Sequence, residues 1–382
     1  MARHSSGRHR WGLLVVLLVV ALSAATASWI VSSPAARQPA TPTASVHVTC
    51  KNRSTDAATL QRAINSSPVG AAIEFQGGTC LLTTGLTLLA DRTYTGENTT
   101  GTVLKQDGSA SYILASSAYV YNSTATGDPL SIRDLTVACD GSGSTDGIIL
   151  LNWQVDVENV DVSGCGGSGI IDTNTNASGG MITNTSVNSR FDNNFITNSG
   201  KYGFYVHDTG NSVTDGFLDN NQIASSGLDA IHLDNAAGWN ISGNHLYAVG
   251  ENAISADRLF GTTISSNYVE DFGDRKQPGT WYGILGTVQN GNGSTIVGNK
   301  IFNDLGEPAG ATHVYIGITQ ANSGTGHLSV TGNVIGGAGH SGIGISVSGG
   351  QNKLEVATYG NQVSGVGTVR VNAGNATLTS GS

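Results

Sequence analysis

The chain has 382 residues, carries a net charge of −9 and contains 53 glycines, while only 12 % of its residues are charged. A chain of this length can bury a large core without further stapling. Its acidity argues against a nucleic-acid partner, because such binding depends on cations that neutralise phosphates. Abundant Gly, Asn, Ser and Thr, with few long charged side chains, predict an ordered, turn-rich β protein.

The N-terminus combines a positive segment with an apolar one. Three arginines precede the uninterrupted apolar run 12–22, and residues 25–27 offer a small-x-small cleavage site. Apolar character resumes at 29–31, so the stretch is also long enough for an uncleaved membrane anchor. Residues 1–31 are therefore either a signal peptide, which makes the protein secreted, or a tether that holds it on the outer face of the plasma membrane. The Pro/Ala/Thr-rich residues 32–46 are expected to form a linker.

A short sequence motif centred on Asn recurs through the second half of the chain. The recurring residues are Asn194, Asn221, Asn244, Asn267, Asn299 and Asn333. Such units cannot bury their apolar side chains alone, but stacking them about 4.8 Å apart forms parallel sheets around a dry core. Asn suits a tight turn, because it tolerates left-handed geometry, and its amide can bond the same amide one coil further on. We therefore expect residues 47–378 to form an all-β solenoid. A leucine-rich solenoid would need Leu at fixed positions, which the chain lacks.

The four cysteines are even in number and belong to an exported chain, so disulfides are expected. Cys139 and Cys165 lie about one repeat apart, which favours a bond between neighbouring coils. Cys50 and Cys80 would then close the N-terminal end. Three pairings are possible in principle, and this one is preferred.

Alternation in three successive strands shows which residues face outward. The inward columns are Phe204, Ile231 and Ile254, and Val206, Leu233 and Ala256. The outward columns are Tyr205, His232 and Ser255, and His207, Asp234 and Asp257, followed by Asp208, Asn235 and Arg258. The next coils present only Thr287 and Thr319 in the corresponding places, so titratable side chains are concentrated on three coils.

The spacing of these side chains suggests chemistry. His207 beside Asp234 can serve as a general base or acid. Asp234 and Asp257 on adjacent coils lie about 5 Å apart, which costs energy unless one is protonated or a cation lies between them. Arg258 is one candidate cation, and Ca²⁺ held by the two carboxylates is the other. The alternative is that these residues form an ordinary solvated face.

Two insertions lengthen the later repeats, at residues 270–281 and 303–313. Both are expected at the same edge of the outward strands, where they would wall a groove, although loops of a solenoid also tolerate insertions without any function. The candidate substrate-binding residues are Arg275, Lys276, Trp281 and Tyr282 in the first insertion, and Asp208 beside the strands.

The repeats at roughly residues 50–375 resemble the pectate-lyase-like superfamily of right-handed parallel β-helices. The resemblance implies a short N-terminal capping helix at residues 56–65. The run Tyr202-Gly203-Phe204-Tyr205-Val206-His207, with Gly227-Leu228-Asp229 and Asp234 downstream, resembles the active-site stretch of alginate C5-epimerases. That family reads Tyr-Gly-Phe-Asp-Pro-His, so Tyr202, His207 and Asp234 match, while Tyr205 and Val206 depart from it.

This resemblance implies a carbohydrate-active enzyme that acts on a uronate-containing polysaccharide by β-elimination or C5 epimerisation. The candidate catalytic residues are Tyr202, Tyr205, His207, His232, Asp234, Asp257 and Arg258. His207 and one of the two tyrosines would exchange protons, and Arg258, with Arg275 or Lys276, would neutralise the uronate carboxylate. Two alternatives remain: a glycoside hydrolase that uses Asp234 and Asp257, and a non-catalytic cell-surface solenoid that binds glycan or protein. We expect a monomer with no cofactor other than Ca²⁺.

Overall fold

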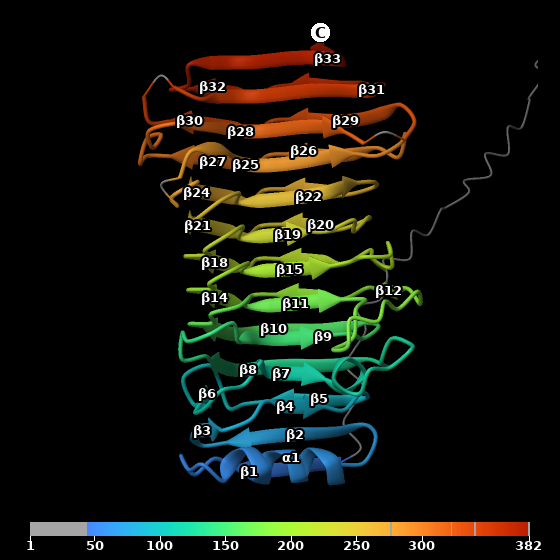
Figure 1. Cartoon of the computed structure of the whole chain (residues 1–382), viewed down its shortest axis with the longest axis vertical. Coiled ribbons are helices and arrows are strands. Elements are labelled where there is room, and N and C mark those ends of the chain that lie inside the picture. The colour runs from blue at the N-terminus through green and yellow to red at the C-terminus, as the bar shows by residue number, and fades with distance from the viewer. Residues whose placement is uncertain (1–43, 276, 322, 340, 381–382) are drawn as a thin grey trace, which may run out of the picture. The chain divides into compact units, whose positions relative to one another are not determined.

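Each coil contributes short strands that pair with the coils before and after it. The computed structural model describes residues 44–380, except 276, 322 and 340. Its strands form a 31-stranded sheet wound into a right-handed parallel β-helix, as predicted. Figure 1 shows the coils stacked from α1 and β1 at one end to β33 at the other. The expectations for residues 1–31, for 32–43 of the linker and for Lys276 fall outside the described residues. Among those described, no helix is long and apolar enough to cross a membrane.

The strands fall into three longitudinal columns. The first, which carries the candidate site, consists of β4 (Leu86–Leu88), β7 (Tyr112–Ser116), β9 (Asp146–Leu150), β11 (Ile170–Thr173), β15 (Phe204–His207), β19 (Ile231–Leu233), β22 (Ile254–Leu259), β25 (Gly279–Val288), β28 (Ala311–Gln320), β31 (Ile343–Tyr359) and β33 (Thr368–Ser380). The second consists of β1 (Ala44–Thr49), β2 (Ala71–Gln76), β5 (Arg92–Thr95), β8 (Leu130–Ala138), β10 (Val155–Ser163), β13 (Arg190–Asp192), β17 (Phe217–Asp219), β20 (Asn240–Ser242), β23 (Thr263–Ser265), β26 (Ser294–Val297) and β29 (Gly326–Thr331). The third consists of β3 (Gly78–Leu82), β6 (Thr102–Gln106), β14 (Phe195–Thr197), β18 (Gln222–Ala224), β21 (His245–Val249), β24 (Tyr268–Phe272), β27 (Lys300–Asn303), β30 (Val334–Gly337) and β32 (Gln362–Ser364). The C-terminal parts of the long strands β8 and β10 also belong to it and join β6 to β14. A separate pair, β12 (Ser186–Val187) and β16 (Val213–Thr214), lies in a side loop.

The N-terminal end is closed by the predicted capping helix, α1 (Asp56–Ser66). Its Ala57, Leu60 and Ile64 recur at helical spacing and are buried against the core of the first coils. A second, four-residue helix, α2 (Ser117–Val120), follows β7. The preferred disulfides are both present: Cys50–Cys80 ties the first coils together, and Cys139–Cys165 joins two later ones.

The recurring Asn residues form the expected ladder inside the stack. From Asn194 to Asn333, each side-chain amide donates to the amide oxygen of the next Asn at 2.9–3.0 Å. Asn361, which was not among the expected residues, ends the ladder. The left-handed position, however, belongs to the preceding residue, as in Asn220 and Gly243, and not to the ladder Asn. This arrangement leaves the ladder side chain pointing inward, where it also caps main-chain groups of neighbouring coils.

The ladder predicts a large cost for removing one of its buried members. Asn267 is 1 % exposed, donates to Ile241 O and Asn299 Oδ1, and accepts from the backbone and side-chain amides of Asn244. Asn267→Ala leaves these partners without their hydrogen bonds, so we expect the free energy of unfolding to fall by about 3 kcal/mol. Urea unfolding followed by circular dichroism measures this, with the exposed Asn372→Ala as control; equal midpoints for the two variants would contradict a stabilising ladder.

Candidate active site

The outward face of β15, β19 and β22 holds the titratable side chains in register. Tyr205 pairs with His232, and His232 with Ser255, along the first column. The alternate residues face the core, since Phe204, Ile231 and Ile254 are fully buried, and Val206, Leu233 and Ala256 are at most 1 % exposed. Both inward columns predicted from the sequence are thus confirmed. The outward residues lie where strand alternation requires them.

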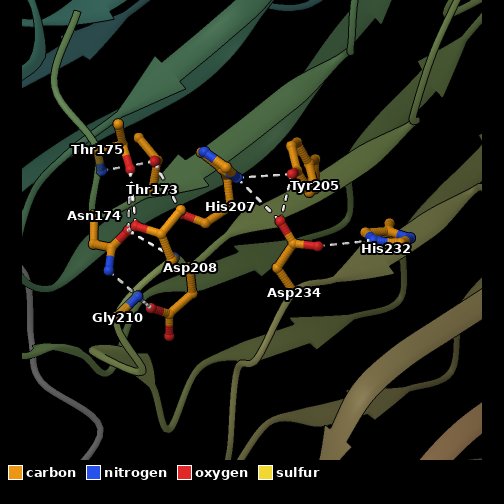
Figure 2. A network of polar contacts seen from close by, with 10 residues as sticks. Thr173, Asn174, Thr175, Tyr205, His207, Asp208, Gly210, His232 and Asp234 are labelled. Carbon is orange, nitrogen blue, oxygen red and sulfur yellow. Dashed lines mark hydrogen bonds and ion pairs between the residues drawn. The ribbon is translucent and has the colours of Figure 1, made fainter. Parts of the chain in front are cut away.

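Tyr205, His207 and Asp234 meet around one carboxylate oxygen, as Figure 2 shows. The Tyr205 hydroxyl donates to Asp234 Oδ2 at 2.5 Å, and His207 Nδ1 lies 3.0 Å from the same oxygen and 2.7 Å from the Tyr205 hydroxyl oxygen. This geometry places the proton of a neutral His207 on Nδ1, which then donates to both oxygens. The other nitrogen, Nε2, has no hydrogen-bond partner among the described residues, and the side chain is 34 % exposed. His207 thus presents a basic nitrogen on an accessible surface.

The second oxygen of Asp234 is bound by a second histidine. His232 Nε2 lies 3.0 Å from Asp234 Oδ1, and its Nδ1 lies 2.7 Å from Asp229 Oδ2. Asp229 itself is buried, 3 % exposed, and its other oxygen accepts the backbone N–H of Asn252. The ring of His232 therefore bridges two carboxylates, one of them inside the protein.

These contacts determine the protonation states of His232 and Asp234. Burial disfavours the charge on His232, but its hydrogen bonds to Asp229 and Asp234 outweigh burial and raise its pKa to about 9. Burial alone would raise the pKa of Asp234, yet the hydrogen bonds from His207, His232 and Tyr205 hold it well below its usual range. At neutral pH the pair is consequently an imidazolium beside a carboxylate.

Two tyrosines cover this charge pair. The ring of Tyr202 stacks on His232 with centroids 4.6 Å apart and lies equally close to Tyr205. Burial and the nearby carboxylates, Asp229 first, raise the pKa of Tyr202 to about 12, and burial with the Asp234 hydrogen bond raises that of Tyr205 further. Both phenols therefore keep their protons at neutral pH and can give a proton more readily than take one.

Asp257 completes the acid–base cluster, by which we mean Tyr202, Tyr205, His207, Asp229, His232, Asp234 and Asp257. Burial raises the pKa of Asp257; His232 opposes this, and Asp234 adds to it. Ligand atoms of His232, Asp234 and Asp257 lie within 4.8 Å of one another, the spacing of a metal site. Calcium prefers oxygen ligands, however, and both nitrogens of His232 already bind carboxylates. The arrangement does not fit Ca²⁺, and the cation that binds Asp234 is instead the imidazolium of His232, which bridges Asp234 and Asp229.

Two candidate site residues, Asp208 and Arg258, make contacts other than those expected. Asp208 is 1 % exposed, and its carboxylate accepts N–H groups of Gly210, Ser212 and Val213, so it braces the turn after β15 and does not face a substrate (Figure 2). Arg258 forms no ion pair with the acid–base cluster. It lies where the register of β22 slips against β25, and its guanidinium packs 5.2 Å from the centre of the Phe260 ring. An irregularity of this kind redirects side chains and cannot be seen in the alternation of the sequence.

The two insertions do lie together, at one edge of the first column. Residues 279–281 pair in parallel with 311–313. Arg275 is held by Glu251 at 2.6 Å, and the Trp281 indole donates to Gln277 O. The ring of Tyr282 lies over Gly317, in the outward column that continues from Ser255, so it covers the sheet beyond the acid–base cluster.

Asp229 is the member of the acid–base cluster that the outward columns missed. It precedes β19 in a turn and therefore belongs to no strand alternation. The signal that identifies it is its position three residues before His232, which brings an acid and an imidazole together where the chain enters the strand. Its sequence context, Gly-Leu-Asp, resembles a common turn motif.

Removing the buried partner of His232 is expected to lower both stability and the pKa of the imidazole. Because the folded pKa of His232 is raised from 6.5 to about 9, the pair stabilises the fold fully below pH 6.5 and loses this effect as the pH rises through 9. Asp229→Asn should cost about 3 kcal/mol at pH 6 and much less at pH 10. Thermal unfolding at both pH values tests this, and an equal loss at pH 6 and pH 10 would contradict an ionic role.

The chain matches no family model and no curated protein in sequence. Its fold is similar to that of the Dettilon tailspike protein, with a TM-score of 0.57 and 14 % identity over 85 % of this chain and 68 % of the other. It is also similar to an alginate lyase from a Paenibacillus species, with a TM-score of 0.52, 15 % identity, and 87 % and 99 % of the two chains covered. The A-module of a mannuronan C-5 epimerase from Azotobacter vinelandii gives 0.50, 15 %, and 85 % and 96 %. At such identities the likeness shows the fold alone, and the chain is a right-handed parallel β-helix protein.

Proposed function

We propose that the protein is an extracellular enzyme that acts on a uronate-containing polysaccharide by removing the proton at C5, leading to β-elimination or epimerisation. The observation that carries the proposal is His207, whose Nδ1 is held by Asp234 and Tyr205 while Nε2 is left without a partner on an accessible face. Such a nitrogen is placed to accept a proton. The similar folds of an alginate lyase and a mannuronan epimerase agree with this chemistry.

In this mechanism His207 Nε2 takes the C5 proton, and the electron pair moves toward the uronate carboxylate. Tyr202, whose pKa is raised to about 12, donates a proton either to the departing glycosidic oxygen or to the opposite face of C5. Asp257, whose pKa burial raises, donates a hydrogen bond to the uronate carboxylate when it is protonated. Asp234 and Tyr205 act as positioning residues, since they hold the ring of His207.

The proposal is tested by incubating the protein with alginate, pectate and chondroitin sulfate. Ultraviolet absorbance reports unsaturated uronate products, and solvent deuterium in the product reports epimerisation. We expect one of the two signals with at least one polymer. Their absence with all three, while reducing ends appear, would contradict proton abstraction at C5.

One observation favours a second candidate, a glycoside hydrolase. The environments of Asp234 and Asp257 shift their pKa values in opposite directions, which is the arrangement of an ionised carboxylate beside a carboxylic acid. New reducing ends without unsaturation would identify this activity. Asp257→Asn would then abolish turnover, whereas under proton abstraction it weakens turnover through the carboxylate contact alone.

A further inference from the structure

The two insertions border an open cavity of about 510 Å³ beside the sheet that carries the acid–base cluster. The first insertion contributes Phe272, Gly273 and Asp274 to its wall, and the second contributes Leu305, Glu307, Ala309 and His313, among others. None of these residues takes part in the proposed proton transfer. A cavity of this volume is within the range of pockets that hold small ligands.

The cavity lies close to the acid–base cluster along the stack. Gly273 N donates to Glu251 O at 2.8 Å and Asp274 N to Val249 O at 3.0 Å, so the wall rests on the turn that leads into β22. The strands β25 and β28 beside the cavity follow β22 by one and two coils, roughly 5–10 Å along the stack. A polysaccharide that crosses the acid–base cluster along this face therefore reaches the cavity within a few sugar units.

A buried nitrogen without a partner marks the cavity as a binding site. His313 is 2 % exposed, and its Nε2 has no hydrogen-bond partner among the described residues. Burial lowers the pKa of His313, opposed by Glu307 and Asp271, so the ring is neutral at pH 7 and offers one uncharged donor or acceptor. Gly273, which also lines the cavity, lies close to this nitrogen, since a Cβ there would stand 2.9 Å from it and 2.8 Å from Trp281. A buried polar atom left in this way calls for a ligand group.

The charge of the wall decides what kind of ligand fits. Asp274 and Glu307 are acidic, and none of the described residues that line the cavity is Lys or Arg. The nearby Arg275 is already paired with Glu251. Two carboxylates without a cation repel a uronate, whereas they accept hydrogen bonds from hydroxyl, amide or ammonium groups. The exposed apolar side chain of Leu305 suits the C–H face of a sugar ring.

We infer that this cavity binds an uncharged or amino sugar of the polysaccharide whose uronate lies at the acid–base cluster. The inference rests on the proposed function and narrows it: the substrate is a mixed polysaccharide, in which a sugar without a carboxylate lies a few units from the uronate. A homopolymer of uronates places a carboxylate in the cavity and binds it poorly.

The test measures binding of disaccharides to the folded protein by saturation-transfer difference NMR at low salt. The probes are N,N′-diacetylchitobiose, cellobiose and digalacturonate. Three variants are compared with the unmodified protein. His313→Phe keeps the ring but removes Nε2, Ala309→Arg introduces a cation at the exposed rim, and Ala125→Arg makes the same change at an exposed residue outside both the cavity and the acid–base cluster.

We expect signals from a neutral disaccharide and none from digalacturonate, a severalfold loss in His313→Phe, and no change in Ala125→Arg. Ala309→Arg should produce a digalacturonate signal that the unmodified protein lacks, because one cation at close range offsets the two carboxylates. No signal from either neutral probe, a preference for digalacturonate in the unmodified protein, or equal binding in His313→Phe would each overturn the inference. The proposed function is measured separately as turnover of polysaccharides, so either can fail while the other stands.

Discussion

Replacing His207 by Gln is expected to lower turnover of the polysaccharide by about 10²–10⁴-fold, the contribution of a positioned general base. The side chain is 34 % exposed, so the fold should keep its stability. What is lost is the unbonded Nε2. Initial rates on the polymer that gives turnover, together with the thermal midpoint, separate the two effects.

His327→Gln is the matched control, since His327 also pairs with a carboxylate, Glu355, and its side chain is 46 % exposed. It lies on β29, outside the acid–base cluster. A similar loss of turnover in both variants, or an unchanged rate in His207→Gln, would show that His207 is not the base. In the latter case Asp234 becomes the group to examine, as the hydrolase requires.

A second large effect is expected from Asp172, whose carboxyl group lies inside the stack of coils. It is fully buried in β11, between Leu150 and Val206 of the neighbouring coils, and neither of its oxygens has a hydrogen-bond partner among the described residues. Burial raises its pKa to about 8, and the charge of Asp208 adds to this. Asp172 is therefore protonated in the folded protein at neutral pH, but ionised in the unfolded chain.

The sign of the pH effect follows from this difference. Because the folded pKa is raised from 3.8 to about 8, the ionisation of Asp172 costs no stability below pH 3.8, and this cost grows until the pH passes 8. At pH 7 the cost is roughly 4 kcal/mol. Asp172→Asn should remove this pH dependence, and Asp172→Val, which also restores an apolar inward column, should raise the free energy of unfolding by about the same amount at pH 7.

Urea unfolding of both variants between pH 4 and pH 8.5 measures the effect. Asp107→Asn, at an exposed carboxylate, is the control and should follow the unmodified protein. If the unmodified protein and Asp172→Asn have parallel pH profiles, Asp172 is not titrating inside the fold as described.

The sequence predicted the fold and the inward columns because a fixed repeat leaves few ways to bury the apolar residues. The recurring Asn motif predicted the ladder for the same reason, since one amide per coil must stack on the next. The left-handed conformation was assigned to the wrong residue because two adjacent turn residues have different roles. Asn220 adopts the left-handed turn conformation, and Asn221 bonds the next coil. A single sequence does not separate these two roles.

The site was predicted less completely. His207 and Asp234 follow strand alternation and could be paired from the sequence, whereas Asp229 lies in a turn and Arg258 follows an irregular part of β22. The charge of His232 also escaped prediction, because it depends on two hydrogen bonds and on partial burial acting together. Strand alternation predicts the face of the sheet on which a side chain lies, whereas the atoms that it contacts depend on how the coils pack in the folded protein.

The central claim is that Asp234 and Tyr205 hold His207 by its Nδ1 and leave Nε2 without a partner, next to a charged His232. Nitrogen-15 NMR of the histidine-labelled protein tests it most directly, with His207→Gln and His232→Gln to assign the signals. At pH 7.5 we expect His232 to carry a proton on both nitrogens, to lose one near pH 9, and neutral His207 to show a protonated Nδ1 and an unprotonated Nε2. A neutral His232 at pH 7.5, or a His207 protonated on Nε2 alone, would contradict the account.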